Sequence, residues 1–409
     1  MTTTGQGLPL LFLIGDTGGG HRSAAKAVGE ALHHAYPGQF EPIIYDPLRG
    51  DGAPLRLRAM IGLYGPCIRL TPWFYALLWR GFGSNRVFRW ARRTLLSPSY
   101  PTVAAAVATH RPAAIVAFHP MTTEPAVLAR ALIAPGIPVL TVITDLVTTH
   151  LAWRDAPVDR IIVPSAPVGR RCALDGLPEE RYTEIGIPVA ADFVRVPLQS
   201  RERQELRRAL GLSGRFLVVM TGGAEGSGGL YRRAAAILRD VDDVDVAVIC
   251  GRNRILRASL HRLARRAGGR LTVLGYVENM ADWLRCAELV VGKAGPGTIA
   301  EATCCAAPLV LTSHVPGQEE GNIEFVVQAG AGRYAAAPRD IAAVIGYLRD
   351  HPAALAAMRA ASGGLSRPAA AADIAALLAD IASQPRSQVG PAESYRGPLG
   401  QQKYPRRLV

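Results

Sequence analysis

Residues 288–302 read ELVVGKAGPGTIAEA, and this stretch decides the fold class. An apolar, β-rich run leads into a turn with glycines at 292, 295 and 297, and the residues after the turn favour a helix. A strand, a glycine turn and a helix in this order build a parallel α/β sheet. Glycines let backbone amides approach a phosphate, and a helix N-terminus adds about half a positive charge. The stretch therefore predicts a parallel sheet with an anion site at its carboxyl edge.

The same alternation of apolar strands and amphipathic helices runs through both halves of the chain. LPLLFLIG opens the first series, and RFLVVMTGG opens a second one from about residue 213. We expect two tandem doubly wound, Rossmann-like domains that face a cleft, an architecture shared by GT-B glycosyltransferases and by some kinases and epimerases. The predicted parts are an N-terminal domain (1–195), a C-terminal domain (205–365), a helix (366–383) and a disordered basic tail (384–409).

The positive charge of the chain is concentrated in residues 49–96 and in the predicted basic tail, residues 384–409. The formal net charge is +13, and residues 49–96 alone hold nine arginines against Asp51, with Trp73, Trp79 and Trp90 among them. We call residues 49–96 the basic aromatic segment. Arginine mixed with aromatic rings favours a surface among anionic lipid headgroups. Single-stranded nucleic acid and a solvated basic helix pair remain alternatives for this composition.

Neither a membrane span nor a secretion signal is expected. The most apolar stretch, MIGLYGPCIRLTPWFYALLW, is broken by Pro66, Arg69 and Pro72, whereas a span needs about 20 apolar residues in a row. The start MTTTGQG lacks a basic leader. The six cysteines form no C-x-x-C pair, which favours reduced thiols without a metal. We expect a cytoplasmic protein, peripheral at the inner face of the membrane.

Three polar loops of the second domain follow predicted strands and together suit a base, a diphosphate and a hexose. They are TGGAEGSGG (221–229), the turn after residue 292, and HVPGQEEGN (314–322). Each loop alone is also compatible with a surface loop. Thr298 and Glu301 fit either a helix capping box or, for Glu301, the hydroxyls of a ribose. The candidate donor-binding residues are Gly222, Gly223, Glu225, Gly226, Lys293, Gly295, Pro296, Gly297, Thr298, Glu301, Gln318, Glu319 and Asn322.

The first domain carries the turn GDTGGGHRS (15–23), which has the glycine spacing of a P-loop but His21 and Arg22 where that motif has lysine and a hydroxyl residue. A helix N-terminus favours the neutral form of an imidazole, which accepts a proton. His21 therefore suits a general base, and the alternative is a capping or core histidine.

The motifs DTGGGHRSAAKAV, KAGPGTIAEA and VPGQEEGNIEFVVQAGAG closely resemble the monogalactosyldiacylglycerol synthases of glycosyltransferase family 28, from about Leu10 to Tyr334. The resemblance implies a GT-B fold, a UDP-hexose donor, a diacylglycerol acceptor, inversion at the anomeric carbon and no required metal or other cofactor. The resemblance leaves open that an anionic lipid activates the enzyme. It assigns His21 as the base and makes Asp145 a second catalytic candidate, with capping as the alternative. The acceptor and lipid candidates are Gly19, Gly20, Arg22, His150 and Trp153.

The resulting hypothesis is a peripheral enzyme that moves galactose from UDP-galactose to 1,2-diacylglycerol. Transfer of glucose or GlcNAc from its UDP derivative, to diacylglycerol or to another lipid, is the enzymatic alternative. The alternative from another class is a non-catalytic protein that binds lipid or UDP-sugar. His150 is expected to be structural, and Trp153 suits either the acceptor cleft or the core. The donor loops argue against a nucleic-acid partner.

Overall fold

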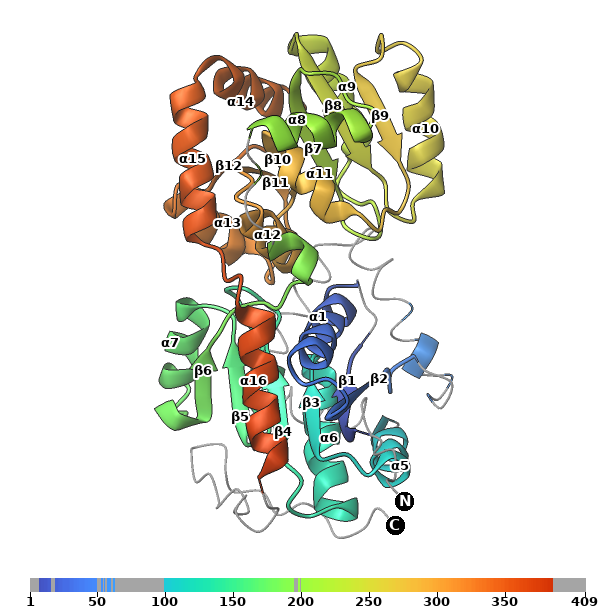
Figure 1. Cartoon of the computed structure of the whole chain (residues 1–409), viewed down its shortest axis with the longest axis vertical. Coiled ribbons are helices and arrows are strands. Elements are labelled where there is room, and N and C mark those ends of the chain that lie inside the picture. The colour runs from blue at the N-terminus through green and yellow to red at the C-terminus, as the bar shows by residue number, and fades with distance from the viewer. Residues whose placement is uncertain are drawn as a thin grey trace. The chain divides into compact units, whose positions relative to one another are not determined.

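The structure is a computed structural model that describes residues 7–15, 19–49, 53, 55, 57–59, 62, 99–194, 198 and 200–384. Most of the basic aromatic segment and the predicted tail from 385 onwards lie outside the described residues. The chain forms two compact units: the first consists mainly of residues before 187 and after 370, and the second mainly of residues 187–370 (Figure 1).

The first unit contains a parallel six-stranded sheet with the order β2-β1-β3-β4-β5-β6. The apolar runs of the sequence become these strands, and β6, which the sequence did not indicate, completes the edge. The strands are β1 (Leu8–Leu13), β2 (Phe40–Tyr45), β3 (Ala114–Ala117), β4 (Val139–Val142), β5 (Arg160–Val163) and β6 (Tyr182–Glu184). The helices are α1 (Gly20–Ala35), α5 (Tyr100–His110), α6 (Pro120–Ile133) and α7 (Ala166–Leu174), with short 3₁₀ helices η2 (Leu151–Trp153) and η3 (Glu179–Arg181).

The central strand β1 is buried on both faces of its sheet. Leu11 and Leu13 belong to one apolar cluster, while Leu10 and Phe12 belong to the cluster on the other face. A parallel sheet is covered by helices on both sides, so its strands read as continuous apolar runs rather than alternating ones. This explains why LPLLFLI is apolar without interruption.

The second unit repeats this plan with the strand order β12-β11-β10-β7-β8-β9. The strands are β7 (Phe216–Thr221), β8 (Val244–Ile249), β9 (Leu271–Leu274), β10 (Leu289–Lys293), β11 (Leu309–Ser313) and β12 (Gly332–Tyr334). The helices are η4 (Ala191–Val194), α8 (Ser200–Ala209), α9 (Leu230–Asp240), α10 (Arg254–Ala264), α11 (Met280–Cys286), α12 (Pro296–Cys304), α13 (Glu320–Gln328), α14 (Pro338–Asp350) and α15 (Pro352–Gly364). The order of strand addition reverses between β7 and β10, which is where doubly wound sheets bind ligands.

The last helix, α16 (Ala370–Ser383), returns to the first unit and lies along its sheet (Figure 1). Ile374 and Leu378 are fully buried in the same apolar cluster as Phe12 of β1. The alanine-rich sequence of this helix suits close packing on a sheet, but it does not say which of two similar sheets is covered. The last described helix thus belongs to the same unit as the first described strand.

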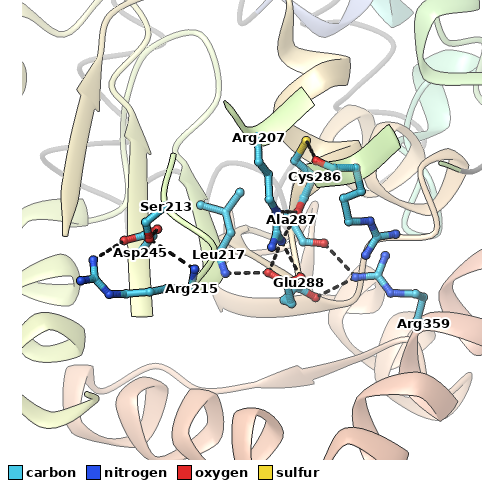
Figure 2. A network of polar contacts seen from close by, with 10 residues as sticks. Arg207, Ser213, Arg215, Leu217, Asp245, Cys286, Ala287, Glu288 and Arg359 are labelled. Atoms are coloured by element: carbon cyan, nitrogen blue, oxygen red, sulfur yellow. Dashed lines mark hydrogen bonds and ion pairs between the residues drawn. The ribbon is translucent and has the colours of Figure 1, made fainter. Parts of the chain in front are cut away.

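A polar network at the amino ends of β7 and β10 ties the second unit together (Figure 2). The carboxylate of Glu288 pairs with Arg207 of α8 and accepts the Leu217 amide at 2.6 Å. Arg359 of α15 donates to the Ala287 carbonyl at 2.8 Å, and burial lowers the pKa of Arg359 to about 10. Because the network lies at the amino ends of the strands, it supports the sheet from the edge opposite the ligand loops.

Candidate functional site

The three predicted loops of the second unit meet at the carboxyl edge of its sheet. They follow β7, β10 and β11, and β10 lies between the other two strands in the sheet. Parallel strands present all their carboxyl ends at one edge, so neighbouring strands bring their loops side by side. The strand-order reversal at β7 and β10 falls within this group of loops.

The loop after β7 is a tight turn that requires glycine. A Cβ at Gly222 would collide with the Ser227 carbonyl, and one at Gly226 would collide with the Cys250 carbonyl. Gly223 and Gly226 also have left-handed backbone, with φ of +70° and +56°. Such a turn exposes backbone rather than side chains, which suits the close approach of a phosphate.

Glu225 stands apart from the backbone of this turn. Its exposed carboxylate lies 3.9 Å from the guanidinium of Arg252, which follows β8. Arg252 in turn lies 5.5 Å over the Tyr276 ring. Glu225 was predicted to bind the donor, and the structure places it at the exposed side of the turn.

The turn after β10 leads directly into α12. Gly295 is the N-cap residue and makes no side-chain capping bond, Pro296 follows in the first turn, and the Ile299 amide donates back to the Gly295 carbonyl at 3.0 Å. The amides of Gly297 and Thr298 precede that first bond, so they point out of the helix end. Because Gly295 is the N-cap, Thr298 and Glu301 do not form a capping box.

Glu301 lies one turn further into α12. Burial raises the pKa of its carboxyl group to about 7, and desolvation is the only contribution. A partly buried carboxylate that pairs with no cation among the described residues gains from neutral hydrogen-bond donors such as hydroxyl groups. This environment fits the ribose alternative from the sequence.

The turn after β10 is tied to the loop before α13 by an ion pair. Lys293 Nζ lies 2.6 Å from Glu319 Oε1, and Glu319 Oε2 accepts the Val315 amide at 2.8 Å. The Glu319 side chain is only 4% exposed, whereas that of Lys293 is 30% exposed. Glu319 therefore orients Lys293 and the loop, and Gln318 lies half-buried beside it.

Asn322 was expected to contact a sugar directly, and its burial argues against that expectation. The residue is 0% exposed, and its Nδ2 donates to the Ala294 carbonyl at 2.9 Å. The amide has room to hold the backbone of the turn but offers no surface to a ligand. We assign Asn322 to positioning the turn before α12.

Buried polar atoms without a hydrogen-bond partner gather around the end of β11. Within the described residues they include Arg233 Nη1, Ser313 Oγ and His314 Nδ1. Native proteins pair nearly all buried polar atoms, so a cluster of unpaired ones indicates a place that a polar ligand completes. The sequence analysis missed Arg233, Ser313 and His314, although Ser313 and His314 directly follow the apolar run of β11.

The candidates near the start of the chain lie after the carboxyl end of β1, where α1 begins. His21 is the second residue of α1 and is half-buried, as is Arg22. Gly19 precedes the helix with a φ of +88°. Gly20 begins α1, so the imidazole of His21 lies in the first turn, where the helix dipole disfavours a charged ring.

Asp145 and Trp153 form a buried pair in the loop after β4. Asp145 Oδ2 accepts the indole N–H of Trp153 at 2.6 Å, and the two residues are 4% and 0% exposed. Trp153 belongs to an apolar core cluster, so the core alternative applies to it rather than a place lining the acceptor cleft. His150 is the N-cap of η2, where its Nδ1 accepts the Ala152 amide at 3.1 Å. That contact fits the structural role expected for His150.

His119 is a further residue that the sequence analysis missed. It follows β3, is 5% exposed and caps α6 by accepting the Met121 amide on Nδ1 at 3.2 Å. A Cβ at Gly15 would lie 2.8 Å from the His119 ring, so the ring packs against the start of the glycine turn. Its position directly after the apolar run AIVAF was the available signal.

The fold and these loops place the protein in the GT-B class. MurG of Acinetobacter baumannii superposes with a TM-score of 0.59 at 16% identity, over 91% of this chain and 99% of that one. HepE of Anabaena, solved in complex with UDP, gives 0.56 at 14% identity, over 91% and 100%. The model of the glycosyltransferase family 28 C-terminal domain matches residues 217–377.

The family follows from the first half of the chain. The monogalactosyldiacylglycerol (MGDG) synthase model matches residues 21–189. The probable monogalactosyldiacylglycerol synthase 2, chloroplastic, of Oryza sativa subsp. indica is 32% identical over 81% of this chain and 72% of its own length. The chain therefore belongs to the monogalactosyldiacylglycerol synthase family, which confirms the resemblance and the GT-B fold expected from the motifs.

The described residues contain neither a membrane-spanning helix nor a cluster of metal-ligating side chains. No helix there is both long and apolar enough to cross a membrane. No group of three or more histidine, cysteine or acidic side chains in that part of the chain is arranged to hold a metal ion.

Proposed function

We propose that this protein is an inverting glycosyltransferase that moves galactose from UDP-galactose to 1,2-diacylglycerol and forms β-monogalactosyldiacylglycerol. The observation that carries the proposal is the set of three adjacent loops around the N-terminus of α12, in a chain of the MGDG synthase family. The names of the relatives suggest the sugar and the lipid. HepE, a protein of the same fold, is solved in complex with UDP, which supports a UDP-linked donor.

Each part of the donor has a matching group in the second unit. Glu301 accepts hydrogen bonds from the ribose hydroxyls, because its carboxyl group is desolvated and has no cationic partner within the described part of the chain. The amides of Gly297 and Thr298 and the glycine turn after β7 face the diphosphate. Lys293, held in place by its ion pair with Glu319, lies at the lip of the turn, and we assign Gln318 to the hexose.

The chemical step is a direct displacement at the anomeric carbon. The hydroxyl oxygen of diacylglycerol bonds to C1 of the sugar from one face while the bond from C1 to the UDP oxygen breaks on the other, which inverts the configuration. His21 takes the hydroxyl proton as a neutral imidazole. The departing diphosphate gains negative charge, which the α12 N-terminus stabilises. The buried pair of Asp145 and Trp153 supports the acceptor side.

The remaining parts of the proposal concern the membrane. The basic aromatic segment docks the enzyme on an anionic bilayer, where the acceptor resides. The enzyme works as a cytoplasmic, peripheral protein, needs no metal and has no nucleic-acid partner. Anionic lipid acts as an activator by recruiting the protein.

A donor panel tests the proposal. Purified protein is incubated with liposomes of anionic lipid and diacylglycerol and with labelled UDP-galactose, UDP-glucose or UDP-GlcNAc, with and without EDTA. We expect galactose transfer that survives EDTA, and a β linkage by NMR of the product. Preferred transfer of glucose or GlcNAc would replace galactose as the proposed donor sugar. No transfer from any donor would favour the alternative of a non-catalytic binding protein.

A further inference from the structure

Arg233 of α9 occupies an unusual position beneath the glycine turn after β7. Its Nη2 donates to the Thr312 carbonyl at the end of β11, at 2.9 Å. Its Nη1 and the Ser313 hydroxyl are both buried and have no hydrogen-bond partner among the described residues. The guanidinium therefore has one satisfied end and one unsatisfied end, and the unsatisfied end carries part of a full positive charge.

The unsatisfied end packs directly against the turn. A Cβ at Gly228 would lie 3.3 Å from Arg233 Nη1 and 3.4 Å from Ser313 Oγ. Gly228 and Gly229 have left-handed backbone, with φ of +92° and +66°. A bare backbone is all that separates the guanidinium from the outer side of the turn.

Among the described residues, Arg233 differs from Lys293 in its lack of an ion pair. Lys293 is paired with Glu319 at 2.6 Å, so that pair adds no net charge. Arg233 makes no ion pair within the described part of the chain, and desolvation lowers the pKa of its guanidinium. A half-buried cation without an ion pair is unfavourable, and an anion brought to the turn relieves that cost.

We propose that Arg233, with Ser313 beside it, is a positioning residue for the diphosphate of a nucleotide donor, and that it stabilises the anion through the turn at Gly228. The inference rests on the proposed function, because it takes the ligand of the second domain to be a nucleoside diphosphate. A charge at this short range and low dielectric acts strongly on a phosphate and leaves a nucleoside unaffected.

Comparison of UDP with uridine tests the proposal in the full chain. Affinities are measured by calorimetry for the wild type and for Arg233→Gln, Arg233→Lys and the control Arg232→Gln, an exposed arginine on the same helix. We expect Arg233→Gln to weaken UDP binding at least about tenfold, the usual scale for a contact with a charged group, with uridine affinity unchanged. Arg233→Lys keeps most of the UDP affinity, and Arg232→Gln keeps all of it.

Two results would overturn the proposal: equal losses of UDP and uridine affinity in Arg233→Gln, which indicate a structural role, or no loss of UDP affinity. Circular dichroism of each variant identifies misfolding, and the Lys variant tests the charge if the Gln variant misfolds. If the wild-type protein binds UDP but transfers no sugar, the proposed function is wrong, whereas the inference about Arg233 still holds. A wild type that binds no UDP defeats both.

Discussion

Glu301 shows how one side chain changes character when the fold removes it from water. Its pKa rises from 4.5 to about 7 because of burial, so the neutral form predominates below pH 7. Between pH 4.5 and about pH 7, the folded protein therefore holds a proton on Glu301 that the unfolded chain has already released. Stability falls as pH rises through that window and stays reduced above it.

Removal of the Glu301 charge is expected to reverse this loss. Glu301→Gln raises the free energy of unfolding at pH 8 by roughly 1 to 3 kcal/mol and leaves it unchanged at pH 4, as measured by urea unfolding. Uridine affinity, free of phosphate titration, rises with pH through about 7 in the wild type and is flat in the variant. An unchanged pH profile in Glu301→Gln would show that another group titrates.

His21 is the residue on which the proposed chemistry depends. We expect His21→Ala to lower kcat by about 10²- to 10⁴-fold, the range for loss of a general base, with UDP affinity unchanged. Single-turnover transfer to diacylglycerol in liposomes measures the step. Lys26→Ala, an exposed residue of the same helix, serves as the control. Near-normal turnover of His21→Ala would remove the base assignment.

At the scale of elements, both domains use the same device: a buried strand, a glycine turn and the start of a helix. In the second unit the turn after β7 is closed by bonds from the Gly226 amide to the Gly223 carbonyl at 3.0 Å and from Asn253 Nδ2 to the Gly226 carbonyl at 3.2 Å. The backbone conformation, rather than any side chain, gives this element its anion-binding shape.

A single methyl group is expected to destroy that shape. The Cβ of Gly226→Ala would strike the Cys250 carbonyl, and the φ of +56° adds strain, so the turn must rearrange. UDP affinity then falls by about tenfold or more in calorimetry. Gly214→Ala, where the added Cβ meets nothing within 4 Å, keeps wild-type affinity. Equal affinities in the two variants would contradict the role of the turn.

At the scale of the whole molecule, the chain leaves the first unit, builds the second and returns with α16. The buried face of α16 completes the apolar cluster over β1 and β3. The first unit is therefore assembled from segments at both ends of the sequence, and its stability depends on residues that follow the second unit in the chain.

Truncation of one side chain in α16 tests this dependence. Leu378 is fully buried, so Leu378→Ala should lower the free energy of unfolding by about 2–5 kcal/mol. Asp373→Asn on the exposed side of the same helix should change it by no more than about 0.5 kcal/mol. Urea unfolding of the full chain measures both. A Leu378→Ala protein as stable as the wild type would mean that α16 contributes little to the first domain.

The sequence by itself determined the two parallel sheets and the loops at their carboxyl edges, because apolar strands, glycine turns and helix starts are written in contiguous residues. Only the tertiary structure decided what surrounds each side chain. It buried Trp153 and Asn322, made Gly295 the N-cap of α12 and raised the pKa of Glu301. It also brought Arg233 beneath Gly228 and α16 onto the first sheet. Burial and pairing depend on residues distant in the chain, and no local pattern records which of them will meet.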